Sequence, residues 1–499
     1  MKMKKTWLLR RFTAAAAAIG LCALTASCGF IVINHPQDQS TDTTAADIGT
    51  DSTSAVTTVP DTTTAAPETT AAPDLREQAQ ARLDTLPDRD YSAANIIIAA
   101  VDADVISPSE TLDDTDAVRI DTRRAVEDKY NTKIITTSTD ISAMLTDAKE
   151  AYLADMYYAD LLLIPQSRLG SFVASGILAN MYSLPFVSFD ADWYDQEIMS
   201  NTIVGNTLYA VSGAANFSPD ELGCIYFNRT LAEKYGIDPY TLVYEGSWTL
   251  DKLEEFSKIA AADINGHGTG LSNEDYIDTL ASAQSLNYVT TYIGERPSID
   301  FMDDEGLAAR ASNTVDRIYS LIYGDSKFAD SKNAWTLFET EALLFCTDRL
   351  SKLDTLPDSQ ISWGLLPMPK YDTLQTSYIS PLFADAPIFC AIANTPSYET
   401  SGLILEALNV AAYEYVEDTY MNTCINYRLR DNNSIYMLEY ILDGAYCDFP
   451  HMFSSGYTTL DDATYTAVYK AVTTRSTLAQ LYKSSQSAAK KELSAMKLY

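Results

Sequence analysis

Histidine is scarce in this sequence, with three among 499 residues. His35 lies in a segment rich in Thr, Ser and Asp, and neither His267 nor His451 has a metal-ligand partner nearby in the sequence. Gly-x-Ser-x-Gly, His-Glu-x-x-His and Walker-type motifs are also absent. These absences argue against a zinc centre, a histidine-based triad and a nucleotide-binding loop. We therefore expect neither an enzyme nor a cofactor.

Basic residues are few as well, because 35 Lys and Arg stand against 68 Asp and Glu, for a formal charge of -33. This charge opposes nucleic acids and anionic membrane surfaces as partners. No Lys or Arg occurs between Arg11 and Arg76, and no Phe, Trp or Tyr between Phe30 and Tyr91. A stretch of Thr, Ser, Ala, Asp and Pro cannot bury enough apolar surface to fold, so 28–75 is predicted to be a disordered stalk.

The N-terminus does contain a long apolar run, from Phe12 to Leu24, behind several Lys and Arg residues. It is shorter than the roughly 20 residues that span a bilayer, so it predicts a cleavable signal peptide over 1–27. The following Leu24-Thr25-Ala26-Ser27-Cys28 resembles a bacterial lipobox, although Thr25 replaces the usual aliphatic residue. The sequence therefore predicts an exported chain, attached by a lipid on Cys28 to the outer face of the cell membrane.

Seven cysteines include Cys22 in the signal and Cys28 at the anchor. The remaining five cannot all pair within one chain and have apolar neighbours, so most are predicted to be buried free thiols. They are Cys224, Cys346, Cys390, Cys424 and Cys447.

Continuous apolar runs alternate with helical patterns after the stalk. Strands are predicted at Asn95–Val101, Thr132–Thr137 and Asp160–Pro165, separated by helices near Asp116–Tyr130 and from Ile141 to Tyr152. This β-α-β-α-β order predicts a parallel sheet with right-handed crossovers. Later strands are expected at Thr207–Val211, Cys224–Asn228 and Ile361–Leu366, and helices around 250–259 and 315–322.

Glycines and acidic residues cluster in Asp263-Ile264-Asn265-Gly266-His267-Gly268, which resembles the start of a calcium loop. His267 occupies the third ligand position and is a poor calcium ligand, so we expect a loop without metal at Asp263 and Asn265. The run Gly266-x-Gly268-x-Gly270 is interpreted as a turn.

Aromatic residues are abundant, with 32 Tyr and 5 Trp. Sugars stack their C–H faces on such rings, so this composition suits a carbohydrate cleft, with core packing as the alternative. Trp193, Tyr194 and Trp248 are the candidate rings.

Several segments together resemble extracellular solute-binding protein family 1, the receptors of bacterial ABC importers, from about Asn95 to Phe449. The segments are Arg123-Arg124-x-Val126-Glu127-x-Lys129-Tyr130-Asn131, Val204-Gly205-Asn206-x-Leu208-Tyr209-Ala210, Tyr226-Phe227-Asn228-Arg229, Glu245-Gly246-Ser247-Trp248-Thr249-Leu250-Asp251 and Leu365-Leu366-Pro367-Met368-Pro369-Lys370-Tyr371.

The resemblance implies an α/β, two-lobe fold like that of periplasmic binding proteins, with a ligand cleft between lobes joined by hinge strands. The lobes would be 92–215 with about 380–420, and 222–372 with about 425–499. The implied function is capture of a solute, mostly a mono- or oligosaccharide, by a monomer that delivers it to an ABC permease.

Residues that follow sheet strands should face the cleft. This rule nominates Asp102, Gln166, and Asp348 and Arg349 after the strand Leu343–Cys346 as ligand-binding residues, with Tyr378 as a further stacking ring. Two alternatives stay open. A surface glycoside hydrolase would need paired carboxylates, and the acidity suits a peptide or cation receptor of the same fold.

Overall fold

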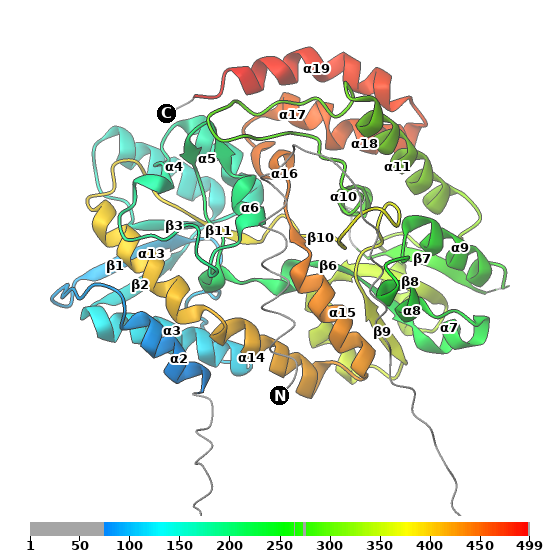
Figure 1. Ribbon diagram of the computed structural model, residues 1–499, viewed down its shortest axis with the longest axis horizontal. Helices are drawn as coiled ribbons and strands as arrows, with labels where there is room; N and C mark the ends of the chain where they lie inside the picture. Colours follow the sequence, from blue (N-terminus) through cyan, green and yellow to red (C-terminus); the bar gives the residue numbers. More distant parts are fainter. Residues whose placement is uncertain (1–73, 264, 273–275, 498–499) are drawn as a thin grey trace, which may run out of the picture. The chain divides into compact units, whose positions relative to one another are not determined.

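The computed structural model describes residues 74–497, except for 264 and 273–275. The described residues belong to one compact unit, Ala71–Tyr499 (Figure 1). The predicted signal peptide at 1–27, Cys28 and nearly all of the predicted stalk lie outside the described residues.

The first sheet has four strands in the order β11-β3-β1-β2. β1 (Asn95–Ala100) pairs in parallel with β2 (Lys133–Ser138) and β3 (Leu161–Pro165), which confirms the predicted parallel arrangement. All five residues of β3 are buried, as a continuous apolar run predicts for a strand covered on both faces. β11 (Pro387–Cys390) arrives from a distant part of the chain and pairs antiparallel with β3.

Helices pack around the first sheet. α3 (Asp114–Tyr130) and α4 (Ile141–Leu153) each begin after an aspartate whose carboxylate accepts hydrogen bonds from the first turn. α13 (Tyr398–Ala412) buries every residue from Ser401 onward, so it forms part of the interior. We call this sheet and its helices the first lobe, which also includes α2 (Leu75–Leu83), α5 (Leu169–Ser175) and α14 (Tyr415–Thr423).

The second sheet has the order β7-β8-β6-β9. β6 (Gly223–Asn228) is fully buried and pairs antiparallel with β8 (Leu343–Arg349) and with β9 (Trp363–Leu366). The strand predictions at 224–228 and 361–366 are therefore confirmed. The strand predicted at 207–211 was too long, because β5 (Thr207–Leu208) has two residues and Val211 forms a separate bridge with Phe389.

β7 (His267–Leu271) corrects the interpretation of the glycine run as a turn. A Cβ at Gly268 would lie 2.3 Å from the Ser257 carbonyl oxygen, and one at Gly270 would lie 2.8 Å from the Ala329 Cβ. The glycines therefore permit close packing around this strand, which is paired in parallel with β8.

We call the second sheet with its surrounding helices the second lobe. Those helices are α7 (Arg229–Tyr235), α8 (Pro239–Tyr244), α9 (Leu250–Ala261), α11 (Glu305–Tyr323), α12 (Ala334–Glu339) and α15 (Asn432–Asp443). The remaining short elements include α6 (Gln196–Ser200), β4 (Ile203–Val204), η4 (Pro219–Glu221), α10 (Tyr276–Ser282), η5 (Leu350–Asp354), β10 (Ser380–Pro381) and β12 (Ala445–Tyr446).

The last helices are α16 (Phe449–Phe453), α17 (Thr458–Ala463), α18 (Tyr465–Thr474) and α19 (Leu478–Ser494). α18 packs against α10 and α11, whereas α16 contacts α5 of the first lobe. The C-terminal segment therefore contacts both lobes, and the expected lobe boundaries stay a prediction.

The five cysteines of the described chain, Cys224, Cys346, Cys390, Cys424 and Cys447, are all buried and free. This confirms the sequence-based expectation. Burial raises the pKa of each thiol, which keeps it in the neutral form.

Candidate functional site

Two chain segments cross side by side between the sheets. One runs through η4 into β6, and the other runs from β10 to β11. Leu222 and Leu382 form an antiparallel bridge between them, and the Phe383 amide donates to the Glu221 carbonyl at 2.9 Å. Residues of these crossing segments therefore meet residues at the ends of β3 and β8.

Arg349 is the centre of the charged cluster at this crossing. Its Nη1 donates to Glu221 Oε2 at 2.7 Å, and Asp385 Oδ2 lies 3.7 Å away. The guanidinium carbon lies 4.5 Å from the centroid of the Phe383 ring. Arg349 was predicted to follow a strand, but it is the last residue of β8, because pairing with Gly223 extends that strand.

Gln166 approaches the same place from the end of β3 in the first lobe. Its Nε2 donates to the Phe383 carbonyl and its main-chain amide to the Ala386 carbonyl, both at 2.8 Å. The side chain is fully buried, and its Oε1 has no hydrogen-bond partner within the described chain. The structure thus brings together two predicted site residues, Gln166 and Arg349, through Phe383.

Asp348 lies beside Arg349 and is also inside β8, not beyond it. Its carboxylate accepts from the Ser272 hydroxyl and from the Arg349 amide, with Lys352 Nζ at 3.8 Å. Burial raises the pKa of Asp348 despite the lowering effects of the amide, Lys352 and Arg349. Burial likewise raises the pKa of Glu221, against the lowering effect of Arg349.

This cluster combines three chemical features. It has carboxylates that accept several hydrogen bonds, a guanidinium with a planar set of five donors, and an aromatic ring beside it. The charged groups can exchange hydrogen bonds with hydroxyl groups, whereas the Phe383 ring is buried and packs against the guanidinium. The arrangement therefore suits recognition of a polar, hydroxylated solute.

Trp248 and Tyr378 lie together elsewhere in the second lobe. Trp248 is fully buried, with its Nε1 donating to the Pro367 carbonyl at 3.0 Å and its ring 5.6 Å from that of Phe345. Tyr378 is nearly buried and donates to the Val243 carbonyl at 3.2 Å. Both rings pack within the lobe, and their contact with a ligand stays a prediction.

Trp193, Tyr194 and Asp102 belong to the first lobe. The Tyr194 hydroxyl donates to the buried Glu406 at 2.9 Å, and the Trp193 ring lies 6.1 Å from that of Tyr413. Asp102 lies in an exposed loop after β1 and accepts from the Asp104 amide at 3.0 Å. Described contacts do not link these three residues to the Arg349 cluster.

Glu221, Phe383 and Asp385 were missed by the sequence reasoning. They lie on the crossing segments, before β6 and before β11, whereas the rule used for prediction considers residues after strands. Two sequence features could have indicated these positions. Asp220-Glu221 stands just before a predicted buried strand, and Asp385 lies between Pro381 and Pro387.

The calcium-like loop is occupied by internal contacts. Asp263 Oδ2 accepts from Lys234 Nζ at 2.6 Å and from the Tyr235 hydroxyl at 2.5 Å, and these bonds lower its pKa. Asn265 is exposed. Within the part of the chain that the structure describes, no group of three His, Cys, Asp or Glu residues could hold a metal ion.

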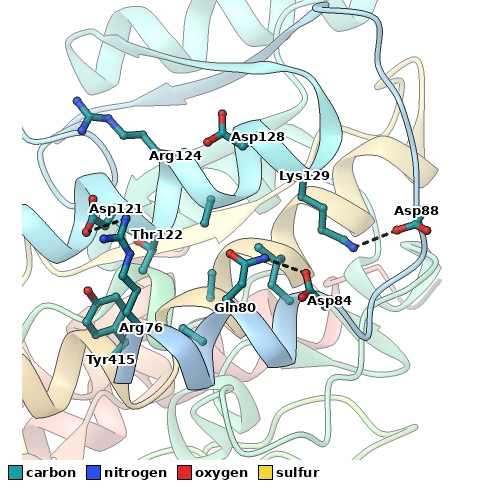
Figure 2. Close-up of a pocket in the computed structure, with 14 residues that line it drawn as sticks. Arg76, Gln80, Asp84, Asp88, Asp121, Thr122, Arg124, Asp128, Lys129 and Tyr415 are labelled. Carbon is teal, nitrogen blue, oxygen red and sulfur yellow. Dashed lines mark hydrogen bonds and ion pairs between the residues drawn. The ribbon is translucent and has the colours of Figure 1, made fainter. Parts of the chain in front are cut away.

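A separate groove lies on the first lobe between α2 and α3 (Figure 2). Its volume is about 460 Å³, and small apolar residues such as Ala79 and Ala125 contribute to its lining. Polar groups around it bond to one another, namely Arg76 with Asp121, Gln80 with Asp84, and Lys129 with Asp88. None of the predicted ligand-binding residues lines this groove.

Across residues 74–263, 265–272 and 276–497, no helix has both the length and the apolar character needed to cross a bilayer.

Comparison with solved structures defines the class of fold. A cyclo/maltodextrin-binding protein complexed with maltotetraose shares the fold at 14% identity and a TM-score of 0.55, over 81% of this chain and 98% of that one. A family 1 extracellular solute-binding protein from Bifidobacterium longum subsp. infantis does so at 12% identity and 0.54, over 81% and 99%. The chain therefore has the predicted two-lobe α/β fold of periplasmic-binding-protein type.

A third structure is the GacH receptor of Streptomyces glaucescens, studied unliganded and with acarbose. It is similar at 11% identity and a TM-score of 0.50, over 81% of this chain and all of that one. No family model and no curated protein matches the sequence.

Proposed function

We propose that this chain is an exported, membrane-tethered receptor that captures a small hydroxylated solute between its lobes and delivers it to an ABC permease. The observation that carries the proposal is the fold, which matches solute-binding proteins over 98–100% of their length. The fold of a receptor supports binding as the function, because this lobe arrangement closes around ligands.

The Arg349 cluster supports an oligosaccharide as the solute class. Its carboxylates, guanidinium and ring come from β8 and both crossing segments, so they occupy the place where the lobes join. Structures of similar proteins contain maltotetraose, acarbose or cycloalternan as ligands. Another similar protein was crystallised with glycerophosphocholine, which is also hydroxylated but carries phosphate.

A binding panel tests the solute class. Thermal unfolding of the chain should be followed with maltotetraose, cycloalternan, acarbose and glycerophosphocholine, one at a time. We expect at least one oligosaccharide to raise the midpoint, with a Kd of about 1 μM, near -8 kcal/mol. Stabilisation by glycerophosphocholine alone would replace the carbohydrate proposal with a phosphodiester one.

The tether is supported by sequence, through the apolar run Phe12–Leu24 and the lipobox-like segment ending at Cys28. Mass spectrometry of the N-terminus extracted from membranes should show a chain that begins at Cys28 and carries a diacylglycerol. A Cys28→Ser chain should lose the modification and leave the membrane fraction. An unmodified Cys28 in the native chain would contradict the tether.

A further inference from the structure

The chain passes between the lobes a third time after α14. It forms a π-helical turn, η7 (Cys424–Arg428), and then reaches α15 through Leu429–Asp431. α14 packs against α3 of the first lobe, and α15 packs against β9 of the second. The chain therefore crosses from the first lobe to the second within a few residues of a π-helical turn. Such turns are rare and are often found at functional sites.

Arg428, the last residue of this turn, contacts carboxylates of both lobes. Its Nη2 donates to Asp113 Oδ2 at 2.7 Å and lies 2.9 Å from Asp354 Oδ1. Asp113 precedes α3 in the first lobe, and Asp354 ends η5, directly after β8 of the second. The Arg428 side chain is 13% exposed, so water reaches this end of both ion pairs poorly, whereas the Asp354 side chain is 49% exposed.

The first-lobe end of this arrangement is rigid. Asp113 Oδ1 accepts from the amides of Thr115 and Asp116 and so caps α3. The guanidinium of Arg428 lies 5.5 Å from the centroid of the Tyr420 ring on α14, which packs on the same helix. Asp113 and Tyr420 therefore hold Arg428 on the first lobe, and its bond to Asp354 is one of the contacts between the lobes.

The Arg428 guanidinium offsets the charges of three nearby carboxylates. Burial and the neighbouring carboxylates of Asp113 and Asp354 raise the pKa of Asp220, whereas Arg428 and Arg119 lower it. Arg119 is already bonded to the Phe217 carbonyl and Asp116. Loss of Arg428 would leave Asp113, Asp220 and Asp354 repelling one another across the junction.

We propose that Arg428 is an ionic latch between the lobes. While Arg428 holds Asp354, the third crossing keeps the present arrangement. When the pair separates, η7 and Leu429–Asp431 rearrange and the lobes move relative to each other, since hinges commonly lie at the ends of elements. The role of this movement in solute capture rests on the proposed function, but the latch itself is defined without a ligand.

Distances between spin labels on the two lobes test the latch in the ligand-free chain. Exposed Glu150 on α4 and exposed Glu233 on α7 would be replaced by cysteine in a full chain with Cys22→Ser and Cys28→Ser. The five other cysteines are buried, which directs the labels to the new positions. Double electron–electron resonance would then be recorded for the parent and for Arg428→Gln.

We expect Arg428→Gln to raise the population of a second interlobe distance by about tenfold, which corresponds to about 1.4 kcal/mol. Asp354→Asn should give the same change, and the double variant should add little, because both changes break one contact. Asp113→Asn retains a capping side chain and should release Arg428 without unfolding α3.

Arg475→Gln is the matched control. Arg475, after α18, forms an ion pair of 2.7 Å with Asp316 on α11 of the second lobe, and this pair does not join the two lobes, so its loss should leave the distances unchanged. Parent-like distances in both Arg428→Gln and Asp354→Asn would overturn the latch. Failure of every solute to bind would overturn the proposed function and leave this result standing.

Discussion

Asp448 shows how a single buried residue sets a pH dependence. It precedes α16, where Oδ1 accepts from the His451 amide at 3.0 Å and Oδ2 from the Tyr465 hydroxyl at 2.8 Å. The residue is 7% exposed. Burial raises its pKa from 3.8 to about 6, although both hydrogen bonds lower it. The folded chain therefore retains a proton there that the unfolded chain loses at lower pH.

A raised carboxyl pKa stabilises the folded state most at low pH. The stability should be fully present below about pH 4, and it should be lost as the pH rises to about 6, a total of about 3 kcal/mol. Asp448→Asn removes this titration while retaining a capping side chain. Denaturant unfolding from pH 4 to pH 8 should show the variant gaining about 3 kcal/mol relative to the native chain. A difference that is constant with pH would contradict this account of Asp448.

At this scale, sequence reasoning located part of the site. Gln166 and Arg349 could be predicted because residues at the ends of strands in open α/β sheets face the cleft, and the structure joins these two, from different sheets, through Phe383. Trp248 and Tyr378 could not be placed, because a sequence does not reveal whether a ring faces solvent or packs on Phe345 and Val243. Long-range pairing decides that question.

α5 and α16 pack closely together, although they are far apart in the sequence. A Cβ at Gly170 would lie 2.0 Å from the Phe453 carbonyl oxygen, and one at Gly456 would lie 2.0 Å from the Gly170 carbonyl oxygen. Ser171 Oγ also donates to the Ser455 carbonyl at 3.0 Å. Glycine at both positions therefore lets the two backbones touch.

Gly170→Ala should destabilise the chain by about 2–3 kcal/mol, because the added methyl group meets backbone that cannot rotate away. Chemical denaturation of the variant would measure this loss. Gly306→Ala in α11 is the control, since the nearest atom to its added methyl group is a side-chain oxygen, Asp304 Oδ1 at 3.2 Å, and not backbone. Equal stability of Gly170→Ala and the native chain would show that α5 and α16 separate at no cost.

Helices and strands with a clear apolar periodicity in the sequence could be predicted. Strands that form only because they pair with distant segments could not. β1, β2, β3 and their intervening helices follow from apolar runs and from one-sided helical patterns. β7 contains Gly268 and Gly270, which lower strand propensity, and it exists because α9 and Ala329 pack closely on it. β11 is likewise defined by its antiparallel partner β3, far away in the sequence.

The whole molecule combines a recognisable fold with a site that sequence describes incompletely. The order of short segments from Asn95 to Phe449 predicted the two-lobe architecture, and structural similarity at 11–14% identity confirms the fold. The solute depends on a few side chains whose convergence requires the crossings to form. The proposed solute site therefore rests on one cluster, around Arg349, where both crossing segments contact the end of β8.

Calorimetric titration of the chain and of Arg349→Gln, with the oligosaccharide that stabilises it best, tests this central claim most directly. The native chain should bind one equivalent with a Kd of about 1 μM. Arg349→Gln should weaken binding by about 10- to 100-fold, because a charge-assisted hydrogen bond contributes about 1.5–3 kcal/mol. Unchanged affinity in a folded Arg349→Gln chain, or no binding by the native chain, would contradict a solute site at the crossing.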